Sequence, residues 1–178
     1  ITDRVSKLEI EKDISKLSLS ELERAMLLYS YIGHAYMWGK SNVANVIPIQ
    51  ISRTWYKISQ KLERPPILSY ASYALNNWKI LDPDQPFDVE NISIMQNFLG
   101  GVDEDWFIMI HVAIEYEAKE ILTNLKSYFI EKNLEQSFLQ KALESMKKIN
   151  AIMNRMPEKC DPFIYYNRVR PYIFGWKN

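Results

Sequence analysis

The stretch that most constrains the fold runs from Asp103 to Leu122 and begins with three acidic residues. The nine residues from Trp106 to Ile114 follow, and His111 is the single polar residue among them. In a helix these nine residues make about two and a half turns, so they present apolar side chains in every direction. Acidic residues favour the positive end of the helix dipole. We therefore expect a buried helix that begins near Asp103.

Two stripes of side chains run along this expected helix at three- and four-residue spacing. One stripe holds Phe107, His111, Ile114 and Ala118, and the other holds Trp106, Ile110, Ala113 and Glu117. One stripe could face the core and the other a ligand cavity, with His111 pointing into that cavity. A buried histidine needs a hydrogen-bond partner, and periodicity alone leaves open whether His111 is a core residue or a functional one.

The composition excludes several classes of protein. A chain of 178 residues is long enough for one sizeable core, or for one domain plus a small satellite. Its 22 basic and 22 acidic residues balance, so there is no electrostatic footprint for nucleic acid. Only 5 glycines are present, which disfavours an all-β fold with its many turns. The apolar runs are too short for a transmembrane helix and the first residues lack the pattern of a signal peptide, so we expect no membrane partner.

Two further features concern the compartment and the extent of the polypeptide. The single cysteine, Cys160, excludes an internal disulfide and fits a reducing compartment, so we expect the protein in the cytoplasm. Since the chain begins at Ile1 rather than at methionine, we expect residues upstream of it in the full polypeptide.

Helical patterns cover most of the remaining chain. Apolar residues at helical spacing predict an amphipathic helix over 1–17. Ser18 and Glu21 have the spacing of a capping box, which predicts that a second helix begins there and ends at Gly39. The other expected elements, in chain order, are a linker over 39–52, a helix over 53–62, a helix over 67–79, a loop over 80–90, a strand or helical turn over 92–99, a helix over 103–132, a break at Asn133 and a helix over 135–156.

A last helix is expected from Asp161 and Pro162, because proline is favoured at the first helical position. Pro171 lies within this segment and lacks an N–H, which predicts a kink or an ending there. Arg168 and Arg170 lie among aromatic residues. An arginine in such a setting can bind a carboxylate with two hydrogen bonds, although a surface arginine stacked on tyrosine gives the same pattern.

Four stretches taken together resemble the indoleamine 2,3-dioxygenase family. They are AYMWGK at 35–40, LERPPILSYASYALNNWK at 62–79, EDWFIMIHVAIE at 104–115 and DPFIYYNRVRPYIFGWK at 161–177. The resemblance implies an all-α fold, in which a small N-terminal helical domain lies over a larger helical domain that holds haem. We expect residues 1–64 to form the small domain and a linker, and residues 65–178 to form the N-terminal part of the haem-binding domain.

The resemblance also implies a reaction. Members of the family use ferrous haem b to bind dioxygen, the co-substrate, and insert both oxygen atoms across the indole C2–C3 bond of tryptophan. The product is N-formylkynurenine, the first compound of the kynurenine pathway. Two alternatives stay open: a relative that mono-oxygenates or rearranges a modified tryptophan in secondary metabolism, with Tyr73 and Phe174 reshaping the pocket, and a non-catalytic helical binding protein.

The resemblance assigns roles to individual residues. The expected substrate-binding residues are Tyr70, Tyr73, Phe107, His111, Tyr165 and Arg170. The expected haem-binding residues are Tyr70, Phe107, Ile173, Phe174 and Gly175. Arg170 would bind the substrate carboxylate, and Phe107 would stack near the indole. His111 departs from the animal enzymes, which have serine there, and resembles tryptophan 2,3-dioxygenases, where a histidine accepts a hydrogen bond from the indole N–H. His111 is therefore the candidate catalytic residue, as a group that orients the ring rather than as a base.

The proximal haem ligand of the family is a histidine far downstream of the GWK motif, outside this chain. His111 is assigned to the distal side, and His34 lies in a helix whose apolar stripe is used for packing. Cys160 could ligate iron as a thiolate, but the family has no ligand there. We therefore expect a C-terminal remainder of the same protein, as a continuous or a separate chain, to supply the metal ligand. Alone, this chain is expected to bind haem weakly and to expose the apolar face of the 103–132 helix.

Overall fold

The computed structural model describes residues 2–10, 12–39, 43–131 and 136–176. Most of these residues are helical, and the sheet found among them has only two short strands, so the predicted all-α class is confirmed. The chain divides into two compact units. Unit 1 comprises Ile1–Asn77, Met95–Gly100 and Phe163–Asn178, and unit 2 comprises Trp78–Ile94 and Gly101–Pro162. The expected domain boundary between residues 64 and 65 stays a prediction.

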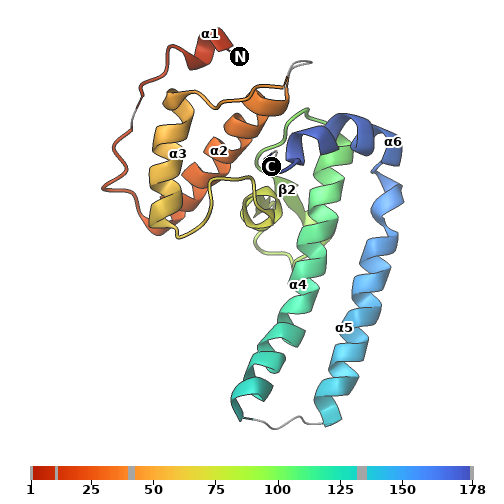
Figure 1. Cartoon of the computed structure of the whole chain (residues 1–178). Coiled ribbons are helices and arrows are strands. Elements are labelled where there is room, and N and C mark those ends of the chain that lie inside the picture. The colour runs from red at the N-terminus through yellow and green to blue at the C-terminus, as the bar shows by residue number, and fades with distance from the viewer. Residues whose placement is uncertain (1, 11, 40–42, 132–135, 177–178) are drawn as a thin grey trace. The chain divides into compact units, whose positions relative to one another are not determined.

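Unit 1 is built on two helices, α2 (Leu19–Trp38) and α3 (Ile49–Lys61), which pack against each other (Figure 1). The predicted capping box is present at the start of α2. The Ser18 hydroxyl accepts from the backbone N–H of Glu21 at 3.4 Å, and the Glu21 carboxylate accepts from the backbone N–H of Ser18 at 2.8 Å. Gly39 is the C-cap, so both predicted ends of this helix are confirmed.

The core of unit 1 lies between these helices and the N-terminal segment. Its buried members are Val5, Ile14, Leu22, Met26, Ile51, Trp55 and Ile58. Gly33 faces Trp55 so closely that a Cβ at this position would lie 2.4 Å from Cζ3 of the indole ring. A glycine is therefore required at this helix contact for steric reasons.

His34 connects three segments of unit 1. Its Nε2 accepts a hydrogen bond from the backbone N–H of Leu68 at 3.0 Å, and its Nδ1 lies 2.8 Å from the carbonyl oxygen of Tyr172. A carbonyl can only accept, so Nδ1 carries the proton and the ring is the neutral Nδ1–H tautomer. Burial lowers the pKa of His34 below its ordinary value of 6.5, and the bond to Tyr172 opposes this effect. The structural role predicted for His34 is thus supported by two directed hydrogen bonds.

This pKa shift predicts a loss of stability in acid. A histidine whose folded-state pKa is lowered contributes fully above its unfolded pKa, and the contribution falls as the pH drops from about 6.5 towards the folded-state value. We expect the free energy of unfolding, measured in urea, to decrease from pH 7.5 to pH 5.5. His34→Gln should reduce this decrease, because its amide cannot titrate. His111→Gln is the matched control. An equal decrease in His34→Gln and in the unsubstituted protein would contradict the assignment.

Two π-helical turns follow in unit 1. The first, η1 (Ala71–Leu75), ends with the backbone N–H of Asn76 bonded to the carbonyl of Ala71 at 2.9 Å. The second, η4 (Tyr165–Val169), continues into the 3-10 turn η5 (Arg170–Ile173). Regular α-helix in this segment is limited to Pro162–Ile164, so it ends before Pro171, and the helix predicted to run from Asp161 to Pro171 was wrong in its extent. Single π-helical turns are rare and are found frequently at functional sites.

Unit 2 contains the small sheet and a long helical hairpin. Strand β1 (Trp78–Ile80) pairs antiparallel with β2 (Ile92–Ile94). Helix α4 (Val102–Glu131) packs side by side with α5 (Gln136–Asn154), and the two run in opposite directions (Figure 1). Short 3-10 turns flank these elements, namely η2 (Val89–Asn91) and η3 (Met156–Glu158), and unit 2 ends at Pro162, the first residue of the short helix α6 (Pro162–Ile164). In the described part of the chain, no helix combines the length and the apolar character needed to cross a bilayer.

Helix α4 has the acidic first turn and the apolar first half that the sequence predicts. Buried positions in that half are Trp106, Ile108, Ile110, Val112 and Ala113. Phe107 and His111, on the other stripe, are half-buried. Leu122 and Ile130 further along are 58% and 71% exposed, so the exposed apolar surface expected on this helix is found in its second half.

Two predictions at the N-terminal end of the chain were wrong. The expected helix over 1–17 is limited to α1 (Thr2–Val5), and turns follow it. Val5 and Ile14 both reach the core, and the backbone N–H of Lys12 donates to the hydroxyl of Thr54 at 3.0 Å instead of closing a helical turn. The linker expected over 39–52 ends earlier, because α3 begins at Ile49, directly after Pro48. Residues 40–42 lie outside the described part.

The helix expected over 67–79 was also wrong in its extent, because helical structure covers only residues 70–75. After η1 the chain enters strand β1, whose residues 78–80 pair with residues 92–94. The side chain of Asn77 bonds to backbone groups of Gln96 and replaces a helical continuation. The sequence left open whether the segment 92–99 forms a strand or a helical turn. The pairing shows that it begins with a strand. The helices expected over 103–132 and 135–156 are confirmed where the structure describes them, and the expected break at Asn133 lies outside the described residues.

Candidate functional site

The expected site residues fall into both units. Unit 1 holds Tyr70, Tyr73, Tyr165, Arg170, Ile173, Phe174 and Gly175, and unit 2 holds Phe107 and His111. Within unit 1, six of the seven lie on or beside the two π-helical turns and η5. The residue types expected from the resemblance thus coincide with the irregular helical geometry of this unit.

Arg170 lies at the junction of the second π turn and the 3-10 turn. Its guanidinium carbon is 4.9 Å from the ring centroid of Tyr166 and 5.9 Å from that of Phe174. Aromatic faces hold a guanidinium by cation–π attraction without occupying all of its N–H donors. Arg170 is exposed, and among the residues that the structure describes no carboxylate forms an ion pair with it. This arrangement suits the binding of an external carboxylate.

Tyr70 and Tyr73 differ in burial. Tyr70 directly precedes η1 and is 42% exposed, whereas Tyr73 is 6% exposed and lies with its ring 6.1 Å from that of Tyr31. Tyr165 begins the second π turn and is half-buried. Tyr70 can therefore contact a ligand through its ring face, while Tyr73 is packed within unit 1.

Asn77 fixes the end of the first π turn, although it is not among the site residues expected from the sequence. Its amide nitrogen lies 2.9 Å from the hydroxyl of Tyr31, 3.0 Å from the carbonyl of Tyr73 and 2.7 Å from the carbonyl of Gln96. Its amide oxygen accepts from the backbone N–H of Gln96 at 2.9 Å. The side chain is fully buried, so these bonds determine where Tyr73 lies. The signal available in the sequence was its helical spacing from Tyr73 and Tyr70, which places a polar residue on one side of the expected helix with two aromatic residues.

Phe107 and His111 form one structural pair on α4. The Nδ1 atom of His111 lies 2.7 Å from the backbone carbonyl oxygen of Phe107, and the two rings are 4.2 Å apart. Because a carbonyl can only accept, Nδ1 carries a proton, and in the neutral ring Nε2 is then the acceptor. The neutral tautomer selected by this backbone bond is the one that can accept a hydrogen bond from an indole N–H.

The side chains of unit 1 fit contact with a flat, largely apolar group such as haem. Phe174 and Tyr70 are exposed aromatic residues, and Ile173 is half-buried beside Phe174. A Cβ added at Gly175 would have its nearest neighbour, Cδ1 of Ile67, at 4.0 Å, so the backbone there is open to close approach. These residues can hold the face of a planar ring system, but they include no histidine or cysteine to ligate iron.

His34 and Cys160, the other side chains that could ligate haem iron, are poorly suited to this role. Both ring nitrogens of His34 are used in hydrogen bonds, and the side chain is fully buried. Burial, with the nearby carboxylates of Asp103 and Asp161, raises the pKa of the Cys160 thiol above its ordinary value of 9.0, which disfavours the thiolate needed for ligation. Within the described ranges, no group of three or more metal-ligating side chains occurs.

Comparison with known proteins gives a consistent result over the whole chain. Residues 1–178 match the family model described as indoleamine 2,3-dioxygenase. Indoleamine 2,3-dioxygenase 1 of Mus musculus is 35% identical over 161 residues, covering 86% of this chain and 39% of that protein. Indoleamine 2,3-dioxygenase of Saccharomyces cerevisiae is 27% identical over 190 residues, covering 100% of this chain and 42% of that protein. Indoleamine 2,3-dioxygenase acdA of Aspergillus candidus is 30% identical over 172 residues, covering 89% of this chain and 42% of that protein. The chain spans about two fifths of the length of these relatives.

Proposed function

The chain belongs to the indoleamine 2,3-dioxygenase family, and on that premise we propose that it is part of a haem-dependent dioxygenase that opens the indole ring of tryptophan. The match of the family model to all of residues 1–178 carries this proposal. When bound, haem iron supplies the oxygen chemistry of such an enzyme. The residues of this chain bind the substrate, orient it and exclude water.

Arg170 is the residue that binds the substrate carboxylate in this proposal. Its place over Tyr166 and Phe174, with no ion-pair partner among the described residues, supports the role. A guanidinium presents two parallel N–H donors that match the two oxygens of a carboxylate. The amino acid portion of tryptophan would thus be fixed relative to the ring.

His111 orients the indole ring. Its Nδ1–H is held by the carbonyl of Phe107, so Nε2 of the neutral ring can accept from the indole N–H. The indole N–H is weakly acidic, and orientation rather than proton removal is the contribution that the hydrogen bond makes. Phe107, whose ring lies against His111, would stack near the indole.

Haem would contact Tyr70, Phe107, Ile173, Phe174 and Gly175 through ring faces and open backbone. A histidine to ligate the haem iron would come from outside these residues, because both ring nitrogens of His34 are hydrogen-bonded to Leu68 and Tyr172. The relatives are more than twice as long as the aligned region, so the region matching their remaining length is the proposed source.

An exposed apolar stripe on α5 also supports a partner in the remaining polypeptide of the enzyme. Leu139, Leu143, Met146 and Met153 follow one another at steps of four, three and seven residues, which places them on one side of the helix, and each is between 46% and 56% exposed. Apolar stripes of this length are normally covered. We propose that the remaining polypeptide of the enzyme covers this stripe. The cytoplasmic location suggested by the single cysteine stays a prediction.

Removing His111 should affect tryptophan more than an analogue that has no indole N–H. The ratio of Kd for 1-methyltryptophan to Kd for tryptophan is expected to fall by about two- to tenfold in His111→Ala, which corresponds to one net hydrogen bond. Equilibrium titration of the complete haem-loaded polypeptide measures this ratio. Equal weakening of both ligands would show that the hydrogen bond does not form.

The substrate itself is tested by a screen of the complete haem-loaded polypeptide. Tryptophan, tryptamine, indole and ring-substituted tryptophans would be offered with dioxygen, and the products identified by mass. We expect the highest kcat/KM for tryptophan. Turnover of a substituted tryptophan alone would favour a modified substrate, for which the exposed Phe174 is the side chain available to shape the pocket. No turnover and no haem binding would favour a non-catalytic protein.

A further inference from the structure

Trp106 occupies an unusual position at the start of the buried half of α4. Its side chain is 1% exposed, and its indole N–H donates to the backbone carbonyl of Arg155 at 3.0 Å. Arg155 lies just beyond the end of α5, so this bond joins the start of one helix to the end of the other. A buried indole requires such a partner, and the bond also fixes the direction in which the ring points.

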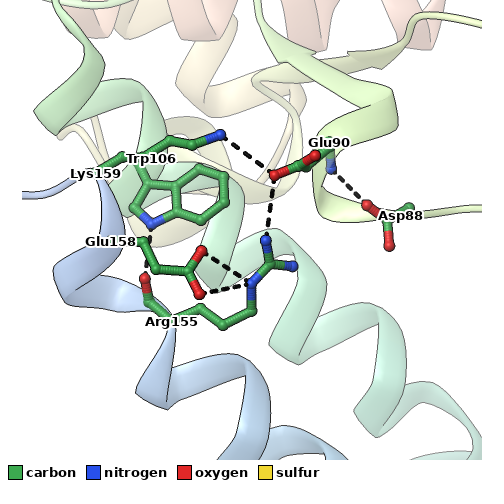
Figure 2. Close-up of polar contacts among 6 residues, drawn as sticks. All are labelled: Asp88, Glu90, Trp106, Arg155, Glu158 and Lys159. Atoms are coloured by element: carbon green, nitrogen blue, oxygen red, sulfur yellow. Dashed lines mark hydrogen bonds and ion pairs between the residues drawn. The ribbon is translucent and has the colours of Figure 1, made fainter.

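Two cations lie over the same ring. The ammonium nitrogen of Lys159 is 4.3 Å from the ring centroid of Trp106, and the guanidinium carbon of Arg155 is 5.2 Å from it. Both cations reach the same carboxylate oxygen of Glu90 at 3.3 Å (Figure 2). We refer to Glu90, Trp106, Arg155 and Lys159 as the Trp106 clamp.

Supporting contacts fix the members of the clamp. The carboxylate of Glu158 accepts from Nε of Arg155 at 3.1 Å and 3.2 Å, and the side chain of Asp88 caps the turn that carries Glu90, at 2.8 Å from its backbone N–H (Figure 2). The ion pairs are partly exposed and add little stability by themselves. Their consequence is geometric, because they hold two cations against one indole ring.

Helix α4 needs such a geometric constraint. From Trp106 to Ile114 it is apolar in almost every direction, so burial alone favours no single rotation of the helix about its axis. One residue corresponds to a rotation of roughly 100°, and a modest change in rotation redirects every side chain. The Trp106 clamp uses a directed N–H bond and a ring face, both of which are satisfied in one orientation only.

We propose that the Trp106 clamp is a positioning device that sets the rotation of α4 and thereby the direction in which Phe107 and His111 point. Phe107 is the next residue along the helix, and His111 is tied to the carbonyl of Phe107, so both follow the rotation that Trp106 imposes. This inference rests on the proposed function of His111, since the direction of its ring has a consequence only where a substrate binds.

The test uses the complete haem-loaded polypeptide with three substitutions. Trp106→Leu removes both the N–H donor and the ring, and Trp106→Phe keeps a ring for the cations but has no donor. Ile108→Val is the matched control, because Ile108 is equally buried on α4 and lies outside the clamp. We measure the ratio of Kd for 1-methyltryptophan to Kd for tryptophan, together with amide hydrogen exchange of residues 107–113.

We expect Trp106→Leu to lower the Kd ratio by about two- to tenfold, as His111→Ala does, and Trp106→Phe to lower it less. The double variant Trp106→Leu with His111→Ala should lose no more discrimination than His111→Ala alone, because Trp106 acts through His111. Ile108→Val should keep the ratio. A Trp106→Leu protein that is less stable but keeps the full Kd ratio would show a purely structural role and would overturn the proposal.

Hydrogen exchange separates this proposal from the proposed function. At equal global stability, amides 107–113 should exchange faster in Trp106→Leu than in Ile108→Val. If the unsubstituted protein does not discriminate between the two indoles, the role of His111 fails and exchange alone decides whether the clamp orders α4. Equal exchange in the two variants would overturn the clamp.

Discussion

Arg170→Ala is expected to lower kcat/KM for tryptophan by roughly one to three powers of ten, because loss of a charged pair costs about 2–4 kcal/mol. The effect should be concentrated in KM, since the carboxylate is remote from the reacting bond. Arg170→Lys should be intermediate, because an ammonium keeps the charge but not the two parallel N–H donors. Steady-state kinetics of the complete haem-loaded polypeptide measures both values.

The chain offers a matched control for this substitution. Arg168 is a second exposed arginine, in the π-helical turn η4 that directly precedes Arg170, and Arg168→Ala should leave kcat/KM within about twofold of the unsubstituted value. Indole and tryptamine lack the carboxylate, so Arg170→Ala should change their kinetics little. If Arg170→Ala lowered kcat/KM for tryptophan and for tryptamine by the same factor, the residue would not bind the carboxylate.

Asn77→Ala is expected to lower the free energy of unfolding by about 3–5 kcal/mol, because each buried polar group left without a partner costs about 1–3 kcal/mol. The substitution removes the partner of the backbone N–H and carbonyl of Gln96, and of the carbonyl of Tyr73. Asn77→Asp should be at least as harmful, since a carboxylate cannot donate to these carbonyls. Urea-induced unfolding gives the values.

Asn76→Ala is the control for Asn77. The side chain of Asn76 is exposed and donates to the carboxylate of Glu23 at 3.1 Å, so its loss should cost less than about 1 kcal/mol. Similar losses for both substitutions would mean that the buried hydrogen bonds of Asn77 do not determine the stability of unit 1.

Helices with local signals were predicted well from the sequence. The capping box of Ser18 and Glu21 sets the start of α2, and the C-cap at Gly39 sets its end. Both signals are local, because each involves only a few neighbouring residues. The acidic first turn of α4 and the apolar spacing of α5 act in the same local way. Each of these features is carried by one residue or by residues within a helical turn or two of one another, which a sequence displays directly.

The segments whose structure was predicted wrongly depend on contacts between residues far apart in the sequence. The 67–79 segment has helical periodicity, but the bonds from Asn77 to Gln96, 19 positions away, and the pairing of Trp78 with Ile94 impose a strand. The N-terminal segment was wrong because Lys12 bonds to Thr54, 42 positions away. Tertiary contacts of this kind override local propensity.

The same distinction applies to the candidate site. Arg170 and His111 stood out because a guanidinium among aromatic residues and a single histidine in an apolar helix are visible in the sequence. Trp106 did not, since its partner Arg155 is 49 positions away and nothing in the local pattern indicates that bond. Positioning residues are therefore harder to predict than the residues they position.

Labelling with ¹⁸O₂ tests the central claim most directly. The complete haem-loaded polypeptide would be reduced to the ferrous state, supplied with tryptophan and ¹⁸O₂, and its product analysed by mass spectrometry before the formyl group exchanges or hydrolyses. A dioxygenase that opens the indole ring is predicted to give N-formylkynurenine carrying two ¹⁸O atoms from one O₂ molecule. A product with one ¹⁸O atom, or with none, would contradict the proposed function.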